Sequence, residues 1–153
     1  MQNKNADSEI VQKFKILHIM LFFILSAAAF LGILPHLNLL PPPPAEKLPD
    51  LPLKEIFYFL AAANLSAGIF LKKLLFKISK PKGSRADPAQ AFKSFMTSNI
   101  VSFAFFESIS IFGFVLFMLS GDKESSMLFT FISIAAMLFQ WPKESEFRQK
   151  LIL

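Results

Sequence analysis

Hydrophobic residues are gathered into four stretches separated by polar segments, and they do not alternate with polar residues along the chain. The stretches cover residues 14–34, 56–76, 100–119 and 126–141. A helix of about 20 apolar residues crosses the roughly 30 Å hydrocarbon core of a bilayer. Lipid offers the backbone no hydrogen-bond partners, and alternation typical of barrel strands is missing, so each stretch is expected to be a helix. The pattern predicts an all-α polytopic membrane protein: four transmembrane helices in one bundle.

The composition agrees with this prediction. Of the 153 residues 54% are hydrophobic, 20 are Phe, and the mean hydropathy is +0.50. A soluble domain of this size cannot hide several long apolar runs in one core, which sets aside the soluble, disordered and fibrous classes. The chain has no Cys, which excludes disulfide scaffolds, thiolate metal sites and cysteine nucleophiles.

The positive charges predict an orientation. Thirteen of the 16 Lys and Arg residues lie in the N-terminal tail, in the connection after the second stretch with its flanks, and in the C-terminal tail, whereas the other side holds only Lys47, Lys54 and Lys123. By the positive-inside rule both termini are expected in the cytoplasm, in an inner membrane of the bacterial type. A cleaved signal peptide, with Ser26–Ala29 as its cleavage region, is the alternative interpretation of the first stretch.

Two connections carry further predictions. The outer loop 35–55 contains the run Pro41–Pro44, which favours a stiff polyproline II segment that acts as a strap or as a docking ligand. The inner loop 77–99 is basic, and its segment Ala89–Phe95 is expected to form a short amphipathic helix on the membrane surface. Contacts with anionic lipid headgroups are expected on this side, and no binding of nucleic acid. The predicted headgroup contacts are Lys72, Lys73, Lys77, Lys80, Lys82 and Arg85.

Glu107 is the candidate for chemistry, because it is the one carboxylate inside a predicted span. An acidic residue at a helix centre costs about 3 kcal/mol on insertion, so it is expected either to bind a proton as a packing contact or to serve as a proton or cation site. His18 and Asn64 are its possible partners on other helices, and Ser110 lies one turn further along the same helix. Close packing of small residues around Asn64 is the ordinary explanation for that position.

The stretch 105–115, FFESISIFGFV, resembles the carboxylate-bearing helix of the proteolipid subunits of rotary ATPases. In that helix the Glu is followed by a small residue, an aliphatic and aromatic pair, and Gly in a similar register. The resemblance implies reversible protonation or cation exchange at Glu107. The whole chain also resembles small four-span bacterial membrane proteins.

Motifs of enzymes are missing from the sequence, and His18 and His36 are predicted near opposite membrane faces, so neither a metal site nor a cofactor is expected. The sequence favours a non-enzymatic membrane component, either an accessory subunit or a small homo-oligomer. The alternative is a transporter or channel coupled to protons or cations, with Glu107 as its site.

Overall fold

The computed structural model describes residues 4–37, 52–79 and 88–152, and within these ranges it contains helices and no β-strand. The elements are α1 (Lys4–Ile33), η1 (Leu34–His36), α2 (Leu53–Ser79), α3 (Pro88–Ser120), α4 (Lys123–Phe139) and α5 (Glu144–Ile152). The all-α prediction is therefore confirmed for the described residues. The polyproline run Pro41–Pro44 and the basic residues Lys80, Lys82 and Arg85 lie outside them.

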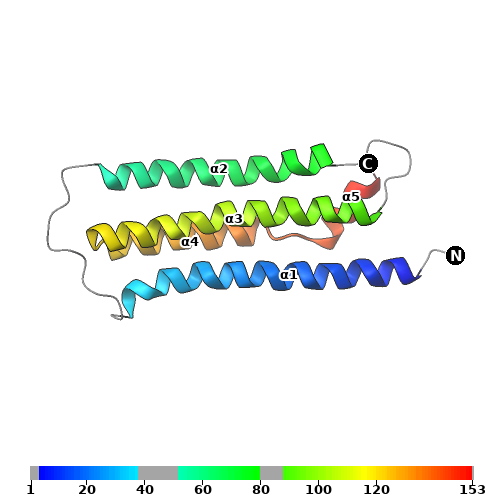
Figure 1. Cartoon of the computed structure of the whole chain (residues 1–153), viewed down its shortest axis with the longest axis horizontal. Helices are drawn as coiled ribbons and strands as arrows, with labels where there is room; N and C mark the ends of the chain where they lie inside the picture. The colour runs from blue at the N-terminus through cyan, green and yellow to red at the C-terminus, as the bar shows by residue number, and fades with distance from the viewer. Residues whose placement is uncertain (1–3, 38–51, 80–87, 153) are drawn as a thin grey trace.

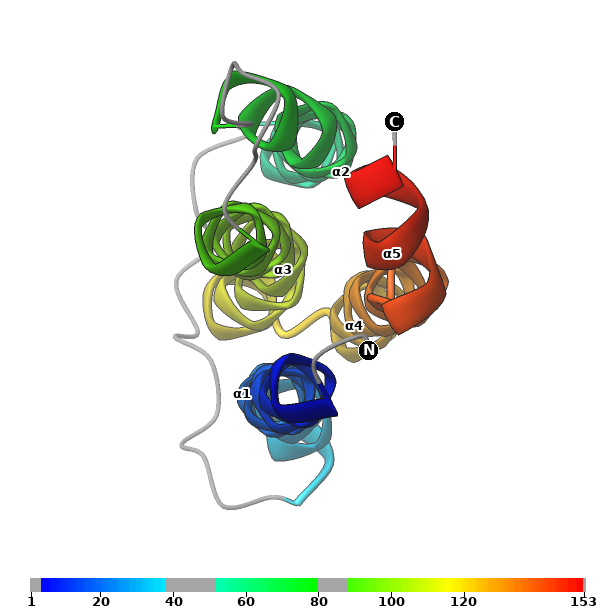
Figure 2. The same ribbon diagram turned by 90° about the vertical axis from the view of Figure 1, so that its right-hand side faces the viewer.

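Three antiparallel helices form a layer, with α3 between α2 and α1 (Figure 1). The fourth helix, α4, packs on one side of this layer, and no described helix covers the opposite side of α3 (Figure 2). Both chain termini lie at the same end of the bundle (Figure 1). We call this the basic end, because the exposed side chains of Lys15, Lys73, Lys77 and Lys93 lie toward it. The other end, with His36, Lys54 and Asp122, is the distal end.

Large apolar side chains lie on the surface as well as in the core, and several polar side chains are buried between the helices. Phenylalanines in the middle and at the ends of the helices are exposed, among them Phe59 at 74%, Phe131 at 71% and Phe139 at 90%. Besides Lys72, the buried polar side chains are hydroxyls and one amide: Ser98, Asn99, Ser102, Ser110, Ser125, Ser126, Thr130 and Ser133. Helices in lipid pack through small hydroxyl residues and turn large apolar ones outward, so this distribution is typical of a membrane bundle.

Three of the helices are long and apolar enough to cross a membrane: α1, α2 and α3 over Ser8–His36, Leu53–Lys77 and Ala89–Ser120. The fourth predicted span corresponds to α4, whose 17 residues are about 25 Å long. Serines and glycines join α4 closely to the central helix. Ser133 Oγ donates to the carbonyl of Phe106 at 2.7 Å, and a β-carbon built on Gly113 would lie 2.6 Å from Phe129 Cβ.

The turn between α3 and α4 is tight. Gly121 adopts a positive φ of 73°, and its backbone N–H donates to the Phe117 carbonyl at 2.7 Å, which closes the end of α3. Asp122 then caps α4 by accepting from the Ser125 backbone N–H at 2.9 Å. Because only two residues separate the helices, α4 must return alongside α3.

The basic end differs from the predicted inner loop 77–99. The second helix ends at Ser79 and α3 already begins at Pro88, so the expected surface helix Ala89–Phe95 is the first part of a long straight helix. At about 50 Å, α3 is longer than the hydrocarbon core is thick. Its extra turns are covered by other helices, not by lipid: Phe92 and Phe95 are buried, with ring centroids 5.5 and 5.4 Å from that of Phe147 on α5.

Candidate functional site

Glu107 lies on the uncovered face of α3. Between its first turn and its last residue, the exposed positions of this helix are Lys93, Thr97, Ala104 and Ile111. They follow one another at helical spacing, and Glu107 falls between the last two on the same face. Its side chain is half-buried. By helical rise it lies about 20 Å from the distal end of α3, inside the part of this helix that is long and apolar enough to cross a membrane.

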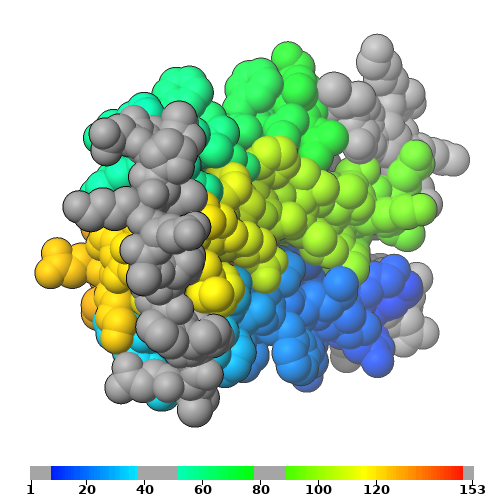
Figure 3. Space-filling view, turned by 60° about the vertical axis from the view of Figure 1, so that its left-hand side comes forward, coloured from blue at the N-terminus to red at the C-terminus, as the bar shows by residue number. Residues whose placement is uncertain are grey.

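Among the described helices, none lies over this face. The atoms of α2, α3 and α1 adjoin one another there, without another described helix over them (Figure 3). We call the surface formed by Ala104, Glu107 and Ile111 the carboxylate face. Ala104 is small, and Ile111 is apolar and 42% exposed, so neither of these two neighbours offers the carboxyl group a polar side chain.

Asn64 is bound to the residue beside Glu107. Ser108 Oγ donates to Asn64 Oδ1 at 3.0 Å and also to the Phe105 carbonyl at 2.7 Å, while the Asn64 amide donates to the Leu60 carbonyl at 2.9 Å. The amide of Asn64 thus links α2 to α3, as close helix packing predicts. Within the described residues, Glu107 itself makes no hydrogen bond or ion pair.

The other two predicted partners are engaged elsewhere. His18 Nε2 lies 3.0 Å from the Pro142 carbonyl, and its ring stacks on that of Trp141 with centroids 5.6 Å apart. Ser110 is fully buried and donates to the Ala28 carbonyl at 2.9 Å, with Thr130 Oγ1 at 3.1 Å. The structure therefore joins His18 to the connection after α4, and Ser110 to α1 and α4. Glu107 is not brought into a polar cluster with them.

A row of buried hydroxyls holds the helices together. Ser102 Oγ donates to the Gly68 carbonyl at 2.9 Å, Ser110 Oγ to that of Ala28, and Ser133 Oγ to that of Phe106. Each of these bonds joins two different helices, which is the usual role of serine between transmembrane helices. Sequence reasoning identified only Ser110. The signal for the others is helical spacing: Ser102 lies eight residues before Ser110 on α3, and Ser133 lies seven residues after Ser126 on α4, so each pair shares one inward-facing side of its helix.

Lys72 does not occupy the headgroup position predicted for it. Its side chain is only 7% exposed, and Nζ donates to the Gln140 carbonyl at 2.9 Å and to Gln140 Oε1 at 3.3 Å. Gln140 is the C-cap of α4, where the helix dipole presents its negative end to a cation. The reason for the difference is that Lys72 lies on the side of α2 that faces the bundle, whereas Lys73 and Lys77 are exposed.

Replacing Lys72 by Met is expected to destabilise the bundle by about 1–3 kcal/mol, because the partly buried C-cap at Gln140 would lose its charged donor. Thermal unfolding in detergent micelles measures the change. Lys73→Met is the matched control: the same substitution one residue away at an exposed position, expected to change stability by about 0.5 kcal/mol or less. Equal effects of the two substitutions would contradict the capping role of Lys72.

Asp122 organises the distal end. Its carboxylate accepts from the Ser125 backbone N–H at 2.9 Å and from Ser125 Oγ at 2.7 Å, and it pairs with Lys54 Nζ at 2.9 Å. The backbone N–H of Ser125 is the main cause, with the Ser125 hydroxyl and Lys54, of a pKa of Asp122 that is lowered from 3.8 to about 2. The ionised form is thus the one that the fold stabilises.

Asp122→Ala is expected to cost about 1–2 kcal/mol at pH 7, the usual value of a lost N-cap. Because the pKa of Asp122 is depressed on folding, its contribution is complete above about pH 4 and is lost as the pH falls toward 2. Thermal unfolding of the wild type and the variant should therefore differ at pH 7 and converge near pH 2, while Glu124→Ala, at the exposed first turn of α4, has little effect. A constant difference over this range would contradict the capping geometry.

No group of His, Asp and Glu residues that could hold a metal ion is found in the described part of the chain. Comparison of the chain with known protein families, with characterised proteins and with solved structures finds no match. The functional argument therefore rests on the residues of this chain alone.

Proposed function

We propose that the chain is an integral membrane protein that crosses the bilayer four times, in an inner membrane of the bacterial type. The observation that carries this proposal is the combination of exposed phenylalanines with buried serines. The tight turn at Gly121 and Asp122 supports a fourth span: if α3 crosses the membrane, α4 must return through the same layer, because it packs along α3. Its length of about 25 Å suits an upright or slightly thinned crossing.

The proposed orientation places the basic end in the cytoplasm. The exposed lysines at this end lie beside both termini, as the positive-inside rule expects. Lys73, Lys77 and Lys93 are positioned to contact anionic headgroups there. Phe147 on α5 is fully buried at the basic end, in the part of the bundle that we place beyond the hydrocarbon core.

We further propose a non-enzymatic role for the protein: it acts as a membrane component that associates with a second copy of itself through the carboxylate face. A half-exposed glutamate in hydrocarbon costs about 2.5–3.5 kcal/mol unless a partner accepts or donates a hydrogen bond. In a two-fold symmetric pair the same surface meets itself, so the Glu107 of each copy can hydrogen-bond to that of the other. Ala104 permits close approach of the two helices.

Disulfide cross-linking through one introduced cysteine tests this association, because the chain has no cysteine of its own. Ala104→Cys in native-like lipid is expected to form a disulfide dimer on oxidation. Leu128→Cys, which is exposed at 45% on α4, is the matched control and is expected to remain mostly monomeric. The double variant Ala104→Cys/Glu107→Leu lacks the carboxyl group. Its dimerisation constant should be lower by roughly 3- to 15-fold, which corresponds to a loss of about 0.6–1.7 kcal/mol. Equal cross-linking at both positions, or a monomer at all lipid dilutions, would contradict self-association.

Transfer of a proton or cation by Glu107 is the second candidate function. It is favoured by the half-exposed position of this carboxyl group on a face open to lipid. Glu107→Gln distinguishes the two functions, since the amide keeps its hydrogen-bonding capacity but cannot exchange a proton. Self-association predicts dimers of the Gln variant, whereas proton transfer predicts loss of flux in vesicles and loss of labelling by a hydrophobic carbodiimide.

A further inference from the structure

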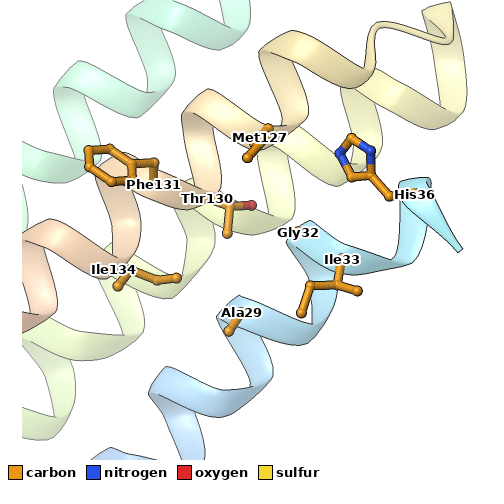
Figure 4. A pocket seen from close by; sticks show the side chains of 8 residues that line it. All are labelled: Ala29, Gly32, Ile33, His36, Met127, Thr130, Phe131 and Ile134. Carbon is orange, nitrogen blue, oxygen red and sulfur yellow. The ribbon is translucent and has the colours of Figure 1, made fainter.

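A groove runs between α1 and α4 in the distal half of the bundle (Figure 4). Its volume is about 380 Å³. One wall consists of Ala29, Gly32 and Ile33 on α1, and the other of Met127, Phe131 and Ile134 on α4. Gly32 lets α1 approach α4 closely along the groove, because a β-carbon on Gly32 would collide with the side chain of Thr130.

The walls of the groove face outward. Ile33, Met127 and Phe131 are exposed at 52%, 62% and 71%. In a bilayer, a groove of this kind is in contact with hydrocarbon, and leaving it empty would forfeit dispersion contacts along both walls. Thr130, the polar residue among its walls, has its hydroxyl 3.1 Å from Ser110 Oγ inside the bundle.

Among the residues that line the groove, the titratable one lies at the distal end. The imidazole of His36 stands at its mouth, at the end of α1 (Figure 4). It is placed there by η1, a single turn of 3₁₀ helix that begins at Leu34 and contains Pro35. On the opposite side, Lys123 is exposed and precedes Met127 by four residues, so it extends the groove-lining stripe of α4 toward the membrane surface. The Asp122 carboxylate at this end is held by Lys54 at 2.9 Å.

We propose that this groove binds one glycerophospholipid of the distal leaflet, with an acyl chain between α1 and α4 and the phosphate at His36 and Lys123. The inference rests on the proposed membrane crossing. The groove extends over the eight residues from Ala29 to His36, about 10 Å along the helix axis, which suits the first part of an acyl chain. A cation and an imidazole at the mouth match an anionic phosphate, and an apolar channel below them matches the chain that is attached to it.

The test uses the whole protein in phospholipid vesicles that contain a small amount of a phospholipid with a photoreactive diazirine on its acyl chain. After illumination, the adducts on each peptide are counted by mass spectrometry. The proposal predicts several-fold more adducts on the segments 29–36 and 127–134 than on the lipid-facing segment 59–70 of α2. Filling the groove with Ile134→Trp should reduce the groove adducts several-fold, whereas Ala63→Trp, exposed on α2, should leave them unchanged.

Substituting the two polar residues at the mouth of the groove tests the proposed phosphate contact without disturbing the core. In His36→Ala/Lys123→Ala the adducts of the phospholipid probe in the groove should fall several-fold, while those of a diazirine alkane without a phosphate should not. Even labelling of all lipid-facing segments, or no effect of the double substitution, would overturn the proposal. Fewer adducts in the groove than on α2 would indicate that a second copy of the chain covers it, and would overturn it too. Release of the protein by alkaline carbonate would instead contradict the membrane crossing itself.

Discussion

Replacing Phe131 by Arg is expected to weaken membrane insertion of α4 by about 2.5–3.5 kcal/mol, or roughly 100-fold in the insertion equilibrium. Phe131 is 71% exposed and is the central residue of α4, eight residues from each end. In the proposed bundle an arginine there would lie in the middle of the hydrocarbon. In a soluble protein the same exposed position would tolerate arginine well.

Phe139→Arg is the matched control for this prediction. Phe139 lies on the same helix and is 90% exposed, but it is the last residue of α4, about 12 Å nearer to the basic end. An arginine at that level can extend its guanidinium group to the headgroups and should cost about 1 kcal/mol or less. A glycosylation reporter fused to α3 and α4 measures both insertion energies. Equal tolerance of the two substitutions would contradict a membrane-spanning α4.

The second large effect is expected for Gly113→Leu, which should destabilise the bundle by about 3 kcal/mol or more. A β-carbon at Gly113 would lie 2.6 Å from Phe129 Cβ and 3.0 Å from the Ser126 carbonyl oxygen. Neither atom can move away by a change of rotamer, so α4 would have to separate from α3. Overpacking of a core costs about 1–3 kcal/mol when side chains can adjust, and more when the backbone must shift.

Two further variants make the Gly113 prediction specific. Ala63→Leu introduces the same side chain at an exposed position of α2 and should leave the thermal unfolding midpoint in detergent nearly unchanged. The double variant Gly113→Leu/Phe129→Ala should recover part of the loss, with a coupling of about 1 kcal/mol or more between neighbouring sites. Additive effects of the two substitutions would show that α3 and α4 do not meet at this point.

The positions of the long helices could be predicted from hydropathy alone, because lipid leaves a spanning backbone no alternative to helix. The stretch 14–34 lies within α1 except for its last residue, which begins η1, while 56–76 lies within α2 and 100–119 within α3. The helix ends were less predictable. Phe92 and Phe95 have the spacing of a surface helix, but α5 folds back and buries them beneath Phe147, a long-range contact that local periodicity cannot reveal.

The candidate site was predictable in its main residue but not in its surroundings. Glu107 attracts attention because a carboxylate is costly in a membrane span. Its partners could not be predicted, since the depth of a residue in the membrane does not determine the direction in which it points around the helix. His18 is directed to Pro142, and Ser110 to Ala28, whereas Glu107 faces outward. Lys72 was unpredictable for the same reason: its side chain points from α2 toward Gln140 and not toward the membrane surface.

The number of crossings is tested most directly by labelling both ends of α4. Glu124→Cys and Ser145→Cys place single thiols at exposed positions just inside the distal start of α4 and just after its basic end. Sealed vesicles of known orientation are treated with a maleimide that cannot cross the membrane, before and after permeabilisation. Four crossings predict that the two cysteines react from opposite sides of the membrane, with Ser145→Cys on the cytoplasmic side. Reaction of both cysteines from the same side would contradict a fourth span and with it the proposed bundle.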